Sequence, residues 1–242
     1  MRATSFKHAA GAALLAFSAA AAAQGSPPAG PRLILVGDST LAPRSGYGNA
    51  LCAAFQQVAC LNLARGGRSS SSYRAEGLWQ TVLALLNEQG APQKNLVLIQ
   101  FGHNDQPGKP GRSTDLATEF GPNLAAYVQE VRAAGAEVLL ITPLTRRSFD
   151  KDGQLQNDLR PWAAATLRVA AERGVPVLDL NALSSATVQA LGPGTADELA
   201  EAPPRFDRTH LGPKGADLFA QQVRDGLLRL KPELAAARTL PP

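Results

Sequence analysis

Apolar runs alternate along this chain with stretches of helical periodicity, and the alternation allows few folds. The runs at residues 33–36 and 96–99 are unbroken, which is typical of strands buried on both faces of a parallel sheet. Strands that alternate with helices build such a sheet through right-handed crossovers. We therefore predict an α/β fold of three layers, a flavodoxin-like five-stranded parallel sheet with helices on both faces. The predicted strands are residues 33–36, 59–63, 96–99, 138–142 and 175–180.

Helices are predicted between these strands, because apolar residues recur there at helical spacing, as at Leu78 and Val82. Trp79 and Trp162 lie in such patterns and are expected in the core rather than at a binding surface. The region after the fifth predicted strand is rich in glycine and proline, which favours a loop. The helices are expected at residues 49–57 and 73–88, from a cap at Ser113 or Thr114 to residue 135, and at residues 158–173 and 213–230.

The first residues have the pattern of a secretory signal peptide. Arg2 and Lys7 precede an alanine- and leucine-rich run without acidic residues, and the run ends in small residues at Ala23. This order predicts cleavage after Ala23 and a secreted or periplasmic protein. A membrane anchor is the weaker interpretation, because a span needs about 20 apolar residues and this run is short and alanine-rich. We predict a signal peptide at residues 1–23, a linker at 24–31 and a single domain at 32–242.

The charge balance argues against a nucleic-acid-binding protein. The chain has 24 Lys and Arg against 20 Asp and Glu, and the basic residues are scattered, with no dense patch and no ladder of aromatic side chains. No run after the predicted signal peptide is long and apolar enough to cross a membrane. We expect no nucleic-acid partner, no membrane span in the mature protein, and a monomer.

The two cysteines, Cys52 and Cys60, leave two interpretations open. In an oxidising compartment they can form a disulfide, and closing so short a loop stabilises a fold by roughly 2–3 kcal/mol. Alternatively, both are small buried apolar residues, which is common for cysteine. Without nearby histidines they cannot supply the four ligands of a structural zinc site.

Ser39 is a candidate nucleophile because of its place after the first predicted strand. Gly37 permits a sharp exit from that strand, and the serine is left at the carboxyl end, where open α/β sheets bind ligands. Asn104 follows the third predicted strand, so it is expected to face the same crevice. A serine hydroxyl needs a base to remove its proton, and histidine is the usual base near neutral pH.

Of the three histidines, His210 suits the role of base best. His8 would leave with the signal peptide, and His103 has no obvious orienting acid except the aspartate two residues later. Asp207 precedes His210 by three residues, a spacing that lets its carboxylate accept the Nδ1 proton while Nε2 faces a serine. The alternative is a surface Asp/His pair at the start of a helix.

Attack on a carbonyl also requires donors for the oxyanion, each worth about 3 kcal/mol. The candidates are the backbone N–H groups of Ser39 and Gly67 and the side-chain amide of Asn104. Taken singly, Gly67 has the ordinary interpretation of a turn residue and Asn104 that of a loop cap. The G-x-S-x-G elbow of the α/β-hydrolases is absent around Ser39, which disfavours that family.

Four short motifs, in this order, resemble those of the SGNH (GDSL-type) hydrolases and together cover most of the predicted domain. They are GDS at 37–39, Gly67, GHND at 102–105 and DRTH at 207–210. More narrowly, the threonine after the serine of the first motif, and the arginine and serine after the glycine, make the sequence similar to the rhamnogalacturonan acetylesterase branch.

This resemblance implies roles that agree with the assignments made from the residues. Ser39 would be the nucleophile, His210 the base and Asp207 the orienting acid. Gly67 and Asn104 would serve with the Ser39 N–H as oxyanion donors. No metal or other cofactor is implied. The implied reaction is ester hydrolysis through an acyl-enzyme, here the removal of acetyl groups from a pectic polysaccharide such as rhamnogalacturonan.

Arg146 and Arg147 follow the fourth predicted strand and are the predicted substrate-binding residues, because an arginine at this edge can pair with a galacturonate carboxylate. Solvated loop charges are the alternative. A rival function is a lipase or thioesterase of the same fold, although the sequence has no long apolar loop to hold a lipid chain. Further rivals are a non-catalytic carbohydrate-binding protein and a metal site at Asp207 and His210.

Overall fold

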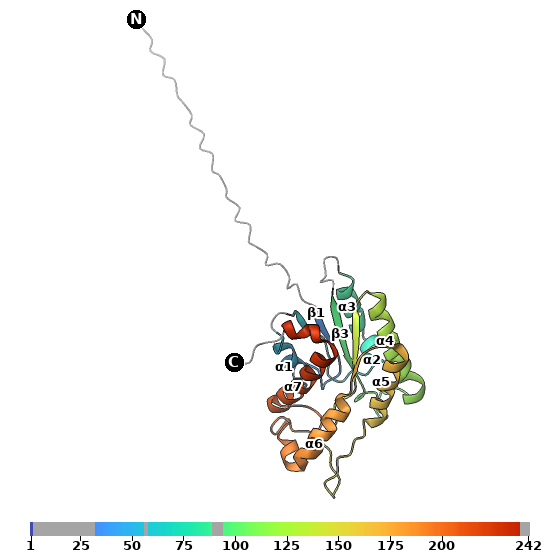
Figure 1. Ribbon diagram of the computed structural model, residues 1–242, viewed down its shortest axis with the longest axis vertical. Helices are drawn as coiled ribbons and strands as arrows, with labels where there is room; N and C mark the ends of the chain where they lie inside the picture. Colours follow the sequence, from blue (N-terminus) through green and yellow to red (C-terminus); the bar gives the residue numbers. More distant parts are fainter. Residues whose placement is uncertain (2–31, 56–57, 89–93, 238–242) are drawn as a thin grey trace.

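The protein has a central sheet with helices on both sides (Figure 1), which confirms the predicted three-layer α/β fold. This computed structural model describes residue 1 and residues 32–55, 58–88 and 94–237. Residues 2–31, which hold nearly all of the predicted signal peptide and the linker, lie outside the described residues, as does the end of the first predicted helix.

The sheet has five strands in the order β2-β1-β3-β4-β5, and every pair is parallel. This is the predicted flavodoxin-like order, in which the direction of winding reverses between β1 and β3. Loops after these two strands therefore diverge and leave a crevice at the carboxyl edge. The strands are β1 (Arg32–Gly37), β2 (Cys60–Asn62), β3 (Asn95–Gln100), β4 (Glu137–Ile141) and β5 (Val177–Leu178).

The helices form two layers over the sheet. In Figure 1, α1 and α7 lie on one side of the strands, and α3, α4 and α5 lie on the other. The regular helices are α1 (Gly48–Ala53), α2 (Ser72–Ala75), α3 (Leu78–Leu86), α4 (Gly121–Ala133), α5 (Arg160–Arg173), α6 (Leu180–Asp197) and α7 (Pro213–Leu230). A π-helical turn, η1 (Leu116–Phe120), precedes α4, and a 3-10 helix, η2 (Pro232–Ala237), follows α7.

The unbroken apolar runs are explained by burial on both faces. Leu33 and Leu35 of β1 belong to the core beneath α1, α6 and α7, whereas Ile34 and Val36 belong to the core beneath α3, α4 and α5. Alternate residues of one strand thus point to opposite layers, so the run is apolar at every one of these four positions. The two tryptophans are buried in the second core, as predicted from their helical spacing.

The helix predicted at residues 73–88 is wrong in one respect, because it is divided into α2 and α3. Gly77 lies between them with φ +77°, a left-handed conformation that ends one helix and starts the next. The fifth strand is shorter than predicted, since only Val177 and Leu178 pair with β4. Pro176 has no N–H to donate to the sheet, and Asp179 already caps the following helix.

The loop predicted after the fifth strand is wrong, because this region contains α6. The Asp179 carboxylate accepts a hydrogen bond from Ala182 N at 3.1 Å and so starts the helix. Near its end, Gly192 adopts φ +72° and is followed by Pro193, so the helix is interrupted there. The glycine and proline that predicted a loop thus mark a kink within a helix.

Cys52 of α1 and Cys60 of β2 form a disulfide, with 5.3 Å between their Cα atoms. Of the two interpretations that the sequence allowed, pairing is the correct one. The bridge joins the edge strand of the sheet to a helix that packs against α7. It therefore fixes the helix of the first crossover to the strand that follows it.

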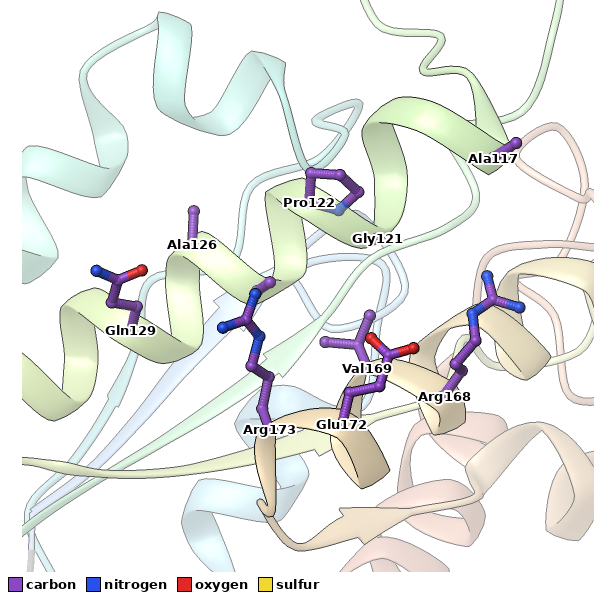
Figure 2. Close-up of a pocket in the computed structure, with 10 residues that line it drawn as sticks. Ala117, Gly121, Pro122, Ala126, Gln129, Arg168, Val169, Glu172 and Arg173 are labelled. Atoms are coloured by element: carbon purple, nitrogen blue, oxygen red, sulfur yellow. The ribbon is translucent and has the colours of Figure 1, made fainter.

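A groove of about 420 Å³ lies between α4 and α5. Ala117, Gly121 and Ala126 form one wall, and Arg168 and Arg173 extend from the other (Figure 2). None of the predicted site residues lines this groove. Among the described residues, no helix is long and apolar enough to cross a membrane.

Replacing both Cys52 and Cys60 by serine should lower the free energy of unfolding by about 2–3 kcal/mol, because the cross-link no longer restricts the unfolded chain. Urea denaturation of the oxidised wild type and the double variant measures the difference. Wild type treated with a reductant should unfold at the midpoint of the double variant. Equal midpoints for the oxidised wild type and the double variant would contradict the prediction.

Candidate active site

Ser39 lies in the turn that follows β1 at the carboxyl edge of the sheet. Gly37 ends the strand, and a Cβ built on it would lie only 2.5 Å from the carbonyl oxygen of Gln100 on β3. Only glycine allows β1 and β3 to approach so closely at this point. The turn is closed by a hydrogen bond of 3.0 Å from Ala42 N to the carbonyl oxygen of Asp38. The serine is consequently presented on a short, well-defined turn.

The imidazole of His210 connects Ser39 to Asp207. Its Nε2 lies 2.8 Å from Ser39 Oγ, and its Nδ1 lies 2.7 Å from Asp207 Oδ2. The three residues predicted from the sequence are therefore brought together in the order hydroxyl, imidazole and carboxylate, which is the arrangement of a catalytic triad. The side chains of His210 and Asp207 are 38% and 44% exposed, so this dyad borders solvent.

Asp207 also organises the backbone around His210. Its Oδ1 accepts hydrogen bonds from the N–H groups of Thr209 and His210, at 2.7 and 2.6 Å. Partial burial raises the pKa of Asp207, but the hydrogen bonds from His210 and Thr209 outweigh this effect and keep the pKa below its ordinary value. The carboxylate therefore stays ionised, as it must to stabilise an imidazolium beside it.

A chain of buried hydrogen bonds fixes the turn that carries Ser39. Tyr47 Oη donates to Gln100 Oε1 at 2.5 Å, and Gln100 Nε2 donates to Thr40 Oγ1 at 2.7 Å. The Thr40 hydroxyl then donates to Asp38 Oδ1 at 2.8 Å. All four of these side chains are fully buried. The residues on both sides of Ser39 are thus tied to β3 and to the start of α1.

His103 pairs with Asp38 in the interior, and not with the aspartate two residues after it. Its Nδ1 lies 3.4 Å from Asp38 Oδ2, and neither side chain is more than 2% exposed. Burial raises the pKa of Asp38, but His103 and the hydrogen bonds from Thr40 outweigh burial and lower it. The pair joins the residue before Ser39 to the residue before Asn104. Sequence spacing gave no signal for this contact.

Asp105 holds the loop after β3 to Ser70, one of four consecutive serines at residues 69–72. Its Oδ1 accepts hydrogen bonds from the Ser70 N–H at 3.0 Å, the Ser70 hydroxyl at 2.6 Å and the Thr114 hydroxyl at 3.1 Å. Burial raises the pKa of Asp105 to about 6, although the hydrogen bonds from Ser70 and Thr114 act in the opposite direction. Asp105 therefore connects two loops through a buried carboxyl group whose pKa is higher than that of an ordinary aspartate.

The predicted oxyanion donors lie at the same edge of the sheet. Gly67 has φ +79°, which favours glycine, and a Cβ built on its neighbour Gly66 would lie 3.8 Å from Ser39 Cβ. Asn104 Nδ2 donates to the carbonyl oxygen of Arg68 at 3.1 Å, and an amide nitrogen carries a second hydrogen. The Arg68 guanidinium donates to the carbonyl oxygen of Gly66 at 2.8 Å. The loop that contains Gly66 and Gly67 thus lies against the turn of Ser39.

The prediction of substrate binding is wrong for Arg147. Its side chain is fully buried, and its Nη2 donates to the carbonyl oxygens of Asp207 and His210. A guanidinium without solvent contact cannot meet a polysaccharide. The neighbouring Arg146 is partly exposed and forms an ion pair with Asp158, so its contact with substrate stays a prediction. The sequence could not show which of two adjacent arginines points inward.

Known proteins are similar to this chain in sequence and in fold. The family model described as the GDSL-like Lipase/Acylhydrolase family matches residues 23–218. The chain belongs to this family. As a GDSL-like acylhydrolase it is a carboxylic ester hydrolase, and a serine nucleophile is typical of the family. Within residues 32–55, 58–88 and 94–237, no group of three His, Cys, Asp or Glu side chains is placed to hold a metal ion.

Curated relatives of this GDSL-like hydrolase are esterases. The rhamnogalacturonan acetylesterase RhgT of Bacillus subtilis is 32% identical over 217 residues, covering 82% of this chain and 90% of its own length. The rhamnogalacturonan acetylesterase of Emericella nidulans is 28% identical over 210 residues, covering 78% of this chain and 81% of its own.

Solved structures of other hydrolases have the same fold. The protein YxiM of Bacillus subtilis superposes with a TM-score of 0.70 at 27% identity over 83% of this chain, which spans only 57% of that protein. The acetylxylan esterase Axe2 of Geobacillus stearothermophilus has a TM-score of 0.59 at 17% identity, covering 86% of this chain and 95% of its own. The second likeness concerns the fold alone.

The raised pKa of Asp105 predicts a pH-dependent stability. Its pKa is about 6 in the folded protein against 3.8 for an ordinary aspartate, so the folded state binds this proton more tightly. Stability should therefore fall as pH rises from about 4 to about 6, by about 3 kcal/mol for this group. Urea denaturation across this range should show that the stability of wild type relative to Asp105→Asn falls by this amount as pH rises.

The matched control is Asp152→Asn, in an exposed turn, where the aspartate side chain is 70% exposed. This variant should keep the wild-type dependence on pH. Stability profiles of wild type and Asp105→Asn that run parallel between these pH values would contradict the role given to Asp105.

Proposed function

We propose that this protein is an exported serine esterase that removes acetyl groups from a plant cell-wall polysaccharide of the rhamnogalacturonan type. Ser39 is the proposed nucleophile, His210 the base and Asp207 the orienting acid. The single observation that carries the proposal is the Nε2 of His210, 2.8 Å from Ser39 Oγ, with its Nδ1 at hydrogen-bond distance from Asp207. A serine hydroxyl in this arrangement is activated for attack on an ester carbonyl.

In the first half of the reaction, Ser39 Oγ attacks the acetyl carbonyl while its proton moves to His210 Nε2. The imidazolium that forms is stabilised by the ionised Asp207. Negative charge develops on the former carbonyl oxygen, and the N–H groups of Ser39 and Gly67 and the amide of Asn104 are its proposed donors. The tetrahedral intermediate collapses when His210 gives its proton to the sugar oxygen, which releases the polysaccharide and leaves an acetyl-serine.

In the second half, water replaces the sugar. His210 Nε2 accepts a proton from the water as its oxygen attacks the acetyl-serine, and the same donors meet the second oxyanion. Collapse of this intermediate breaks the bond to Ser39 Oγ, which recovers its proton from His210. Acetate leaves and the hydroxyl is restored. Every proton thus passes through one imidazole, so the distance between His210 and Ser39 limits both halves of the cycle.

The sugar substrate is proposed from the relatives and from the motifs. Two proteins named rhamnogalacturonan acetylesterases align with about four fifths of this chain. The threonine after Ser39 and the Arg68–Ser69 pair after the glycine resemble the same branch. Proteins of the same fold also include an acetylxylan esterase, so the choice of polysaccharide has to be tested directly.

Ser39→Ala should reduce acetate release by a factor on the order of 10⁶ while leaving the fold intact, because no other group can form the acyl-enzyme. The matched control is Ser185→Ala on α6, where the serine hydroxyl accepts a hydrogen bond from Asn157 and touches no proposed site residue. Circular dichroism and acetate assays of both variants decide the result. Turnover by Ser39→Ala at the wild-type rate would refute the assignment.

A panel of substrates tests the acyl group and the polysaccharide. Acetylated rhamnogalacturonan, acetylated xylan, an aryl acetate and an aryl octanoate are compared by kcat/KM. The proposal expects the highest value on acetylated rhamnogalacturonan and a preference for acetate over octanoate. A preference for octanoate would instead favour the lipase or thioesterase alternative, and a preference for xylan would change the polysaccharide but keep the reaction.

Export is proposed from the pattern of residues 1–23 alone. The mature protein should begin at Gln24, as measured by mass spectrometry of the protein recovered from the periplasm or the medium. A full-length chain retained in the cell membrane would support the anchor instead. The single domain at residues 32–242 and the monomeric state are part of the same proposal, and size-exclusion chromatography with light scattering measures the latter.

A further inference from the structure

Arg147 has a buried positive charge that the proposed reaction does not use. Its side chain is 0% exposed, which is rare for an arginine outside a dedicated site. Burial lowers the pKa of the guanidinium, and the nearby Asp207 carboxylate acts against this effect. A cation is costly to bury, so its place in the fold calls for a physical reason.

The hydrogen bonds of Arg147 lead to residues 207–210, which we call the acid–base segment, whereas its buried Nε and Nη1 have no hydrogen-bond partner among the described residues. The guanidinium Nη2 donates to the carbonyl oxygen of Asp207 at 2.8 Å and to that of His210 at 2.6 Å. The backbone N–H of Arg147 donates to the carbonyl oxygen of Arg208 at 2.8 Å. Arg147 alone thus binds three of the four backbone carbonyl groups of the segment.

The acid–base segment needs such support, because it lies outside any helix or strand, between α6 and α7. The remaining residue, Thr209, is held from the same side, since Arg146 Nε donates to its hydroxyl at 3.2 Å. The stretch after β4 that carries both arginines is itself well fixed: Leu144 is fully buried, and the Thr145 N–H donates to the Ser184 hydroxyl of α6 at 3.1 Å. The position of the acid–base segment is therefore set from the stretch that follows β4.

The turn of the serine has an anchor of its own. It is fixed to β3 and α1 through the buried chain of Asp38, Thr40, Gln100 and Tyr47, and no hydrogen bond of that chain involves the acid–base segment. One further link joins the two parts, because Leu211 N donates to the carbonyl oxygen of Ser45 at 2.9 Å and Ser45 Oγ donates to that of Ser39 at 2.8 Å. This link reaches only the residue after His210, so the 2.8 Å contact between Ser39 and His210 also depends on how Arg147 holds the segment.

We propose that Arg147 is a positioning residue that holds the carbonyl groups of Asp207 and His210 and so sets the distance from the imidazole to Ser39. The inference rests on the proposed roles of these three residues. A displacement of about 1 Å between reacting groups costs a rate factor on the order of 100. Loss of the guanidinium should therefore lower kcat and leave KM unchanged, because the substrate never contacts Arg147.

The deciding variant is Arg147→Met, which keeps much of the side-chain volume without the charge or the donors. Steady-state kinetics are measured on a neutral aryl acetate and on acetylated rhamnogalacturonan. We expect kcat to fall on the order of 100-fold on both substrates, with KM within about twofold of wild type. Arg168→Met, on the exposed wall of the groove in Figure 2, is the matched control and should retain full kcat.

Two outcomes for folded Arg147→Met overturn the proposal. One is a kcat within threefold of wild type on both substrates. The other is a raised KM confined to the acidic polysaccharide, which would make Arg147 a substrate ligand. Retained activity of Ser39→Ala is a separate result that overturns the proposed function, whatever Arg147→Met does. A wild type active on the aryl acetate alone removes only the proposed polysaccharide.

Two further variants separate positioning from stability if Arg147→Met does not fold. Arg147→Lys keeps the charge but not the planar guanidinium, so it should fold with a smaller loss of kcat and an unchanged KM. Arg147→Ala should regain kcat when guanidinium ion is added at a low, non-denaturing concentration. Full kcat in folded Arg147→Lys, or no rescue of folded Arg147→Ala, overturns the proposal. Failure of all three variants to fold also overturns it, since Arg147 would then act on stability alone.

Discussion

The parallel pairing of β1 with β3 is the constraint on which the rest of the site depends. It brings the ends of two strands to one edge, and the crossovers that leave them run to opposite layers. The two strands approach closely at their carboxyl ends, where a side chain at Gly37 would collide with the Gln100 carbonyl. That close approach lets Gln100 reach Thr40 and lets His103 reach Asp38. The turn of the serine is therefore built from contacts between these two strands.

Several polar and charged side chains are buried in the interior at the carboxyl edge of the sheet. Asp38, His103 and Asp105 are buried, although each would be better solvated at the surface. Their partners lie on different segments, so each one ties loops together that a hydrophobic contact could not place as accurately. The apolar cores under the two helix layers provide stability, whereas these polar contacts fix the positions of individual side chains.

The sequence predicted the parts of the structure that depend on local pattern. Uninterrupted apolar runs predicted the strands, and the three-residue spacing of Asp207 and His210 predicted their contact. It failed where the result depends on tertiary burial. Arg146 and Arg147 are chemically alike, and only the packing of the stretch after β4 against residues 207–210 decides that one is partly exposed and the other buried. The spacing of Asp38 and His103 along the sequence did not indicate that they pair. The helix α6 was missed because Gly192 and Pro193 lie within it, and such residues end helices more often than they kink them.

The two edges of the sheet are formed by its shortest strands, β2 with three residues and β5 with two. An edge strand offers unpaired backbone groups to which another chain can add, and the hazard grows with the length of the edge. Both edge strands are short, so each offers few unpaired backbone groups. The disulfide at Cys60 also attaches β2, the longer of the two, to α1. The sheet is thereby poorly suited to growing from one molecule into the next by the addition of strands at its edges.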